Sequence, residues 1–104
     1  MLVLDRTHFD HMTGADRALQ TEVLGLFRMQ VDGWRAAFAA EPGWRDAIHT
    51  MKGSARGIGF AALAAACEAA ETAPEGDTLA ALANVRASLD EALSALEQFA
   101  AEAA

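Results

Sequence analysis

Apolar residues recur at intervals of three and four over most of the chain, which is the period of an amphipathic helix. One such stripe, near the end of the sequence, comprises Leu82, Val85, Leu89, Ala92, Leu96, Phe99 and Ala103. An earlier stripe comprises Leu19, Val23, Leu26, Phe27, Val31, Trp34 and Phe38. We expect both stripes to pack into the core of a helical protein.

Turn and capping residues divide the chain into five predicted helices. The first is short, from about Arg6 to Met12, and ends at Gly14. The second begins after Asp16, a capping residue, and runs to about Ala40. The third helix has Pro42 in its first turn and ends at Gly57 or Gly59. The fourth runs from about Phe60 to Thr72 and is followed by a turn at Pro74-Glu75-Gly76. The last helix is capped by Asp77 or Thr78.

Short connections place successive helices side by side and antiparallel. The prediction is therefore an all-α fold, an antiparallel four-helix bundle with a short additional N-terminal helix, forming a single domain over residues 1–104. Composition agrees, because alanine is abundant and tyrosine is absent, a balance that favours helix over strand. The 53% of apolar residues also excludes a disordered chain.

Charge and cysteine content restrict the partners and the compartment. Eight basic and 15 acidic residues give a net charge of −7, which repels nucleic acids and anionic lipid. The longest uncharged run, from Gly57 to Cys67, is too short to cross a membrane, and no secretion signal is visible. Cys67 is the single cysteine, which we expect in the core. A reduced, cytoplasmic setting is the expectation. We also expect a monomer, because each apolar stripe is used within one bundle.

The third helix combines an apolar face with a cationic one. With His49 at zero and about 100° per residue, its apolar residues fall between about 160° and 260°: Trp44, Ala47, Ile48, Met51, Ala55 and Ile58. The residues predicted to face water within about 60° of His49 are Arg45, Lys52, Gly53 and Arg56. His49 is therefore predicted to be exposed in a row of cations.

Gly53 is unexpected inside a helix, where glycine costs about 1 kcal/mol relative to alanine. Helical side chains lean toward the N-terminus, so the residue four places after His49 would normally cover the imidazole. Glycine at this position leaves the ring open to a partner. Lys52, three places after His49, is within reach of an anion attached to the ring. This is the arrangement that a phosphorylated histidine requires.

The sequence His49-Thr-Met-Lys52-Gly53-Ser54, followed by Gly59, Leu63, Cys67 and Glu71, resembles the histidine-containing phosphotransfer (HPt) domain of bacterial phosphorelays. The motif spans about 23 residues, and the predicted bundle covers essentially the whole chain. Met51 replaces the leucine usual in the family, a volume-conserving change. Arg56 is less typical of the family and is a candidate for partner choice.

The resemblance implies that His49 accepts a phosphoryl group from an aspartyl phosphate on a receiver domain and passes it to another receiver. It assigns the attack to Nε2, with Glu71 accepting a hydrogen bond from Nδ1 and with Lys52 and Arg56 stabilising the transferring oxygens. The chain would be a phosphocarrier without a cofactor of its own, because the Mg²⁺ ion is expected on the receiver. Its partners would be response-regulator receiver domains or a hybrid histidine kinase, docked partly on the second helix.

Two alternatives remain open on sequence grounds. His8 and His11, with Asp5 and Asp10 nearby, are candidates for a metal site, although further converging ligands would be needed. The other alternative is a non-catalytic helical adaptor that binds receiver or kinase domains without phosphotransfer. The presence of His49, Lys52 and Gly53 argues against a domain that has lost phosphotransfer.

Overall fold

The computed structural model describes residues 3–39 and 43–103, with the side chain of Ala103 outside the description. The described elements are α1 (Arg6–Thr13), α2 (Arg17–Phe38), α3 (Gly43–Ile58), α4 (Ala61–Thr72), the 3₁₀ turn η1 (Glu75–Asp77) and α5 (Thr78–Ala103). Each observed boundary lies close to its predicted position. The predicted boundaries at Ala40 and Pro42 fall outside the described residues.

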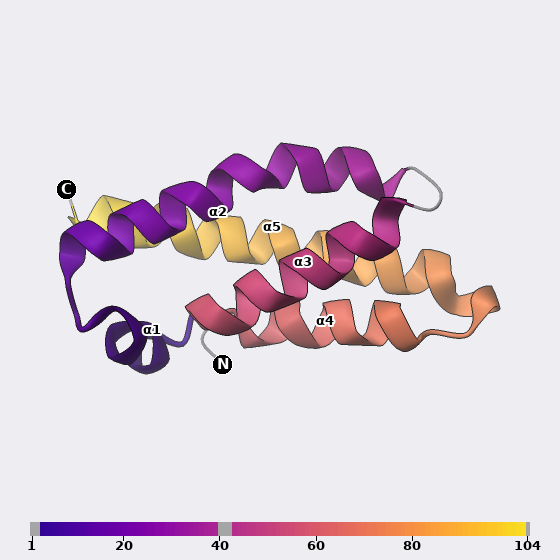
Figure 1. Ribbon diagram of the computed structural model, residues 1–104, viewed down its shortest axis with the longest axis horizontal. Helices are drawn as coiled ribbons and strands as arrows, with labels where there is room; N and C mark the ends of the chain where they lie inside the picture. The colour runs from indigo at the N-terminus through magenta and orange to yellow at the C-terminus, as the bar shows by residue number, and fades with distance from the viewer. Residues whose placement is uncertain (1–2, 40–42, 104) are drawn as a thin grey trace.

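The four long helices form an antiparallel bundle in which each packs against its neighbours in the chain, and α2 also contacts α5 (Figure 1). Helix α1 lies at one end of the bundle and contacts α2 and α3 (Figure 1). The predicted all-α bundle with an additional N-terminal helix is confirmed. None of the described helices combines the length and apolar character needed to cross a bilayer.

Short polar side chains and glycines fix the helix ends. The Asp5 and Asp16 carboxylates accept backbone N–H groups in the first turns of α1 and α2, at 3.0 and 3.1 Å. Gly14 ends α1 in the left-handed region, at φ 64°. Gly59, at φ 111°, follows α3 where the chain passes so close to Asp5 that a Cβ atom would lie 2.9 Å from its carbonyl oxygen. Only glycine fits both requirements of that position.

The apolar stripe of α5 is buried as predicted from Leu82 to Phe99. Met51 and Cys67 are also fully buried, from the inner faces of α3 and α4. Phe99 contributes to holding α1 in place, because its ring packs edge-on against Phe9 at a centroid distance of 5.7 Å. The guanidinium of Arg17 lies 4.2 Å from the centre of the Phe99 ring, a cation–π contact.

The buried stripe of α2 differs from the prediction. Leu19 and Leu26 are exposed, whereas Gln20 and Leu24 are buried. Gln20 is accommodated because its side-chain Nε2 donates to Asp10 Oδ1 at 2.7 Å and to Thr13 Oγ1 at 3.0 Å. Gln20 and Leu24 continue the spacing of three and four that Phe27, Val31, Trp34 and Phe38 follow, whereas Leu19 and Leu26 lie outside it. Both leucines are therefore left on the surface, and Leu26 lies beside α3.

Candidate functional site

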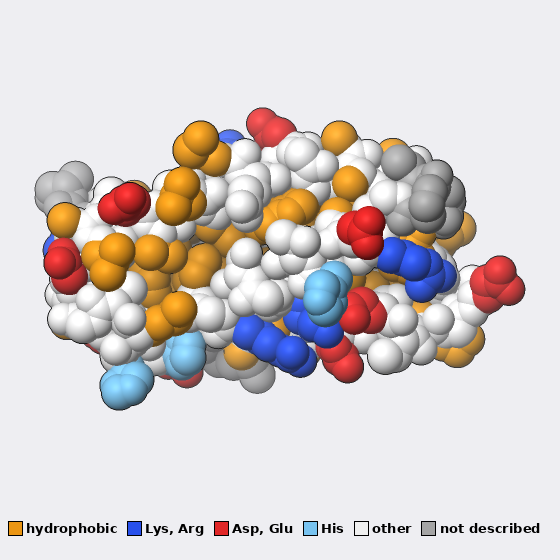
Figure 2. Space-filling view, in the orientation of Figure 1, with side chains coloured by type: hydrophobic (Ala, Val, Ile, Leu, Met, Phe, Trp, Pro, Cys, Tyr) orange, Lys and Arg blue, Asp and Glu red, His pale blue; other side chains and the backbone are white. Residues whose placement is uncertain are grey.

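His49 lies on the outer side of α3, and 75% of its side chain is exposed. The opposite face of the helix is buried as predicted, with Trp44, Ile48 and Met51 in the core. A partner can therefore approach the imidazole without disturbing the packing of the bundle. Figure 2 shows histidine, basic and acidic side chains gathered on this face over α3 and α4.

Glu71 of α4 approaches the imidazole from the side. Its Oε1 atom lies 3.5 Å from His49 Nδ1, and the Glu71 side chain is one quarter exposed. A carboxylate oxygen can only accept, so this placement favours the tautomer with the proton on Nδ1. In that tautomer Nε2 carries the free lone pair, which makes Nε2 the nucleophilic nitrogen.

The prediction that Lys52 faces water is wrong. Its side chain is only 11% exposed, and its ammonium lies between two carboxylates of α4. Lys52 Nζ is 2.9 Å from Glu68 Oε2 and 3.0 Å from Glu71 Oε1. The cause is the position of Lys52 at the edge of the apolar face, where its methylene stem is covered while the charged end reaches the neighbouring helix. These two carboxylates raise the pKa of Lys52, Glu68 more than Glu71.

Glu71 is held by Lys52 more firmly than by His49. The Lys52 ammonium lowers the pKa of the Glu71 carboxyl, with a smaller contribution from His49, so Glu71 is ionised near neutral pH. Glu71 Oε1 is itself buried, and none of the described groups meets it in good hydrogen-bonding geometry. The charges of Lys52, 3.0 Å away, and of His49 when protonated, 3.5 Å away, offset the burial of this oxygen.

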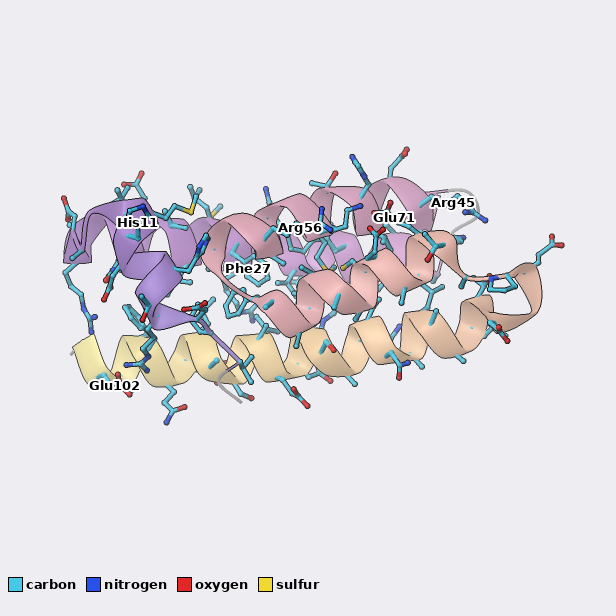
Figure 3. The ribbon with its side chains drawn as sticks, turned by 90° about the horizontal axis from the view of Figure 1, so that it is seen from below. His11, Phe27, Arg45, Arg56, Glu71 and Glu102 are labelled. Carbon is cyan, nitrogen blue, oxygen red and sulfur yellow. The ribbon has the colours of Figure 1, made fainter. Side chains whose placement is uncertain are left out.

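The other two predicted cations are also engaged. The Arg45 guanidinium lies 4.4 Å from the centre of the Trp44 ring. Arg56 Nη2 lies 3.8 Å from Glu68 Oε2, and 61% of its side chain is exposed. In Figure 3 Arg56, Glu71 and Arg45 follow one another along the length of the molecule. In place of the predicted open row of cations, Lys52 and Arg56 are paired with carboxylates and Arg45 lies against an aromatic ring.

Glu68 belongs to this cluster, although it was not among the predicted site residues. A signal was available in the helical hairpin of α3 and α4. Lys52 and Glu68 each lie eight residues from Phe60 at the turn, and His49 and Glu71 each lie eleven residues from it. Residues equally distant from the turn of an antiparallel helix pair come level, because both helices rise by the same amount per residue. The spacing therefore brings both pairs together.

Gly53 opens onto an apolar groove between α2 and α3. A Cβ atom built on Gly53 would meet nothing within 4 Å outside its own helix backbone and chain neighbours, so the packing of the chain does not require glycine there. The groove is lined by Met12, Val23, Leu26, Phe27, Gln30, Gly53, Ser54, Gly57 and Ile58. Figure 2 shows hydrophobic side chains gathered over α2, on the same face as the charged side chains over α3 and α4.

Cys67 lies in the core, close to the charges of Glu71 and Lys52. Burial raises the pKa of its thiol to about 11. At neutral pH the group is therefore a thiol and not a thiolate, which is the nucleophilic form of cysteine. Its role is packing, as predicted.

The alternative metal site has no support in the structure. The described residues contain no group of three or more histidine, cysteine or acidic side chains placed to hold a metal ion. His8 Nε2 instead lies 3.1 Å from the carbonyl oxygen of Gly57, at the end of α3. The histidine thereby connects α1 to α3.

Comparison with known proteins gives two matches. Residues 10–99 match a family model described as the Hpt domain. The structure is similar to the crystal structure of the histidine phosphotransferase ShpA from Caulobacter crescentus, with a TM-score of 0.85 and 37% sequence identity. The alignment covers 97% of this chain and 93% of that chain. A search of curated protein sequences gives no significant match.

Proposed function

Because the chain belongs to the Hpt domain family, whose members are phosphocarriers in histidine phosphotransfer, we propose that His49 is its phosphoryl-accepting residue. The donor would be an aspartyl phosphate on a receiver domain, and the acceptor a second receiver domain. The observation that carries this proposal is the exposed His49 imidazole with Nδ1 facing the Glu71 carboxylate. No other histidine in the described residues lies next to a carboxylate that is itself held by a buried lysine.

The chemistry requires one bond exchange. The lone pair of His49 Nε2 attacks phosphorus, the Nε2–P bond forms, and the bond from phosphorus to the aspartate oxygen breaks with its electron pair left on the aspartate carboxylate. The Nδ1 proton remains on the ring, which becomes positively charged, and Glu71 stabilises that charge. Transfer to the second receiver reverses these changes.

Catalysis would be shared with the receiver, because phosphoryl transfer depends mainly on positioning and on neutralising charge. From this chain, Arg56 is exposed beside the site, and Lys52 lies behind it. Lys52 would act by exchanging one of its carboxylate contacts for a phosphoryl oxygen when His49 is phosphorylated. The Mg²⁺ ion and the reactive aspartate would belong to the receiver domain, in the cytoplasm.

The groove between α2 and α3 is the proposed docking surface for the receiver. Its apolar lining includes Leu26, which is 56% exposed, and it continues to Gly53, one turn from His49. Docking there would bring the partner over the imidazole, and the absence of a side chain at Gly53 would keep the approach to Nε2 clear.

The test is to incubate the purified chain with a panel of phosphorylated receiver domains and to map the labelled residue. We expect label on His49 that is lost in acid and retained in base, as for a phosphoramidate and unlike an acyl phosphate. The His49→Gln variant should take up no label and should keep its helicity and melting temperature, because the residue is exposed. Receiver binding without any label on the wild type would support a non-catalytic adaptor instead.

A further inference from the structure

We propose that Glu68 is a positioning residue that limits how strongly Lys52 and Arg56 can hold a phosphoryl group on His49. This inference rests on the proposed phosphotransfer at His49. Glu68 takes no part in the bond exchange. It would set the balance between the phosphorylated carrier and the phosphorylated receiver, and so keep the group ready to leave.

The contacts of Glu68 place it between the two cations of the site. A single oxygen, Oε2, lies 2.9 Å from Lys52 Nζ and 3.8 Å from Arg56 Nη2. Glu71, by contrast, contacts Lys52 and His49. Each carboxylate therefore serves a different pair of groups, and Lys52 is shared between them.

Packing does not explain why a carboxylate occupies this position. About half of the Glu68 side chain is exposed, and the core residues of α4 lie on its other face: Leu63, Ala64, Cys67 and Ala70. Its carboxylate pairs with the ammonium of Lys52, whose side chain is 11% exposed, and it is the larger of the two influences that raise the pKa of Lys52. The same oxygen faces Arg56, so the charge of Glu68 acts on both cations beside His49.

The charge balance gives the direction of that effect. With neutral His49, the cations of Lys52 and Arg56 are matched by the carboxylates of Glu68 and Glu71. A phosphoryl group adds about −1.5 to −2 charges at neutral pH. It must then compete with Glu68 for the N–H donors of the two cations, and Glu68 also repels it. Removing the Glu68 charge should therefore stabilise phosphorylated His49 relative to the free carrier.

The experiment uses a receiver domain that phosphorylates the wild-type chain in the assay above. At equilibrium, the ratio of phosphohistidine to aspartyl phosphate is measured for the wild type and for Glu68→Gln. We expect the variant to raise this ratio about two- to fivefold, the range that exposed charge pairs produce. The difference should shrink in about 1 M NaCl, where charges are screened over about 3 Å, whereas a structural disturbance would not follow salt in this way.

Two further variants keep the result interpretable. Glu97→Gln removes the same charge from an exposed site on α5 and should leave the ratio unchanged. Arg56→Gln removes a cation and should lower the ratio, because one positive charge fewer is left to stabilise phosphorylated His49. An unchanged or lowered ratio in Glu68→Gln, or an equal rise in Glu97→Gln, would overturn the role of Glu68 while phosphotransfer at His49 stands. A wild type that takes no label from any receiver would instead overturn the proposed function, and this inference with it.

Discussion

The two sides of α3 are built in opposite ways. Toward α4, the helix presents a charged seam, in which Lys52 is buried against Glu68 and Glu71. Toward α2, it presents an apolar groove with glycines at 53 and 57 and with Leu26 exposed above them. His49 stands between the two, with most of its side chain in solvent.

The difference separates what the chain completes by itself from what it leaves for a partner. In the seam, every charge has an opposite charge within 4.0 Å in the described structure, so the environment of the imidazole is set before any partner arrives. In the groove, apolar surface is exposed to water, which costs free energy that burial by a partner would recover. Changes on the groove side should therefore affect docking, and changes in the seam should affect chemistry.

The largest effect is expected from Gly53→Gln. The new side chain has room in the free protein and should raise the free energy of unfolding by about 0.5 kcal/mol, because glycine is a poor helix former. It would also stand between the partner and the imidazole, so transfer should slow on the order of 10²-fold, the scale of a small misplacement of reacting groups. Transfer rates and thermal melts measure the two effects separately.

Gly25→Gln is the matched control for this variant. Gly25 is an exposed glycine of α2 whose added Cβ would likewise meet nothing within 4 Å. We expect the same gain in stability and an unchanged transfer rate. Equal transfer in Gly53→Gln and the wild type would show that an open approach is unnecessary.

Leu26→Asp should weaken receiver binding about tenfold, the loss typical of a contact that matters in an interface. The fold should be unaffected, because Leu26 is 56% exposed. Leu79→Asp makes the same change at a leucine that is 82% exposed at the start of α5, and it should leave binding unchanged. Titration of each variant with labelled receiver measures the affinity, and equal losses in both variants would point to overall charge instead of the groove.

Glu71→Gln should slow transfer by about fivefold with unchanged receiver affinity, since a partly exposed charge pair contributes up to about 1 kcal/mol. The amide oxygen of glutamine can still accept a hydrogen bond from Nδ1–H, but it carries no negative charge to stabilise the positive ring. Single-turnover rates at saturating receiver separate the two quantities. A loss of affinity without a loss of rate would mean that Glu71 contributes to docking and not to the transfer step.

The smallest effect is a dependence of stability on pH. The pKa of Glu71 is lowered in the folded chain from an ordinary value of 4.5, mainly by Lys52. Its ionised form therefore stabilises the fold above that value, and the contribution is lost as the pH falls through the lowered pKa. Thermal melts at about pH 6 and about pH 3 should show a smaller difference between the wild type and Glu71→Gln at the acidic end. A constant difference would mean that the contact contributes nothing.

Periodicity and capping were sufficient to predict the helices and the outward position of His49, because both depend on local sequence. The burial of Lys52 depends on carboxylates that the neighbouring helix supplies, and a single helical wheel does not contain them. The exposure of Leu26 was missed for a related reason. The buried stripe of α2 includes a polar residue, Gln20, whose hydrogen-bond partners belong to α1 and are absent from a single helical wheel.

The protonated, enclosed sulfur of Cys67 makes the chain easy to label at chosen positions. A maleimide reacts with exposed thiolates, and the native sulfur presents neither exposure nor charge at neutral pH. A cysteine introduced at Met29, which is 79% exposed on α2, would thus carry a fluorophore with no competing native site. Binding and release of a receiver could then be followed by fluorescence on the otherwise unaltered molecule.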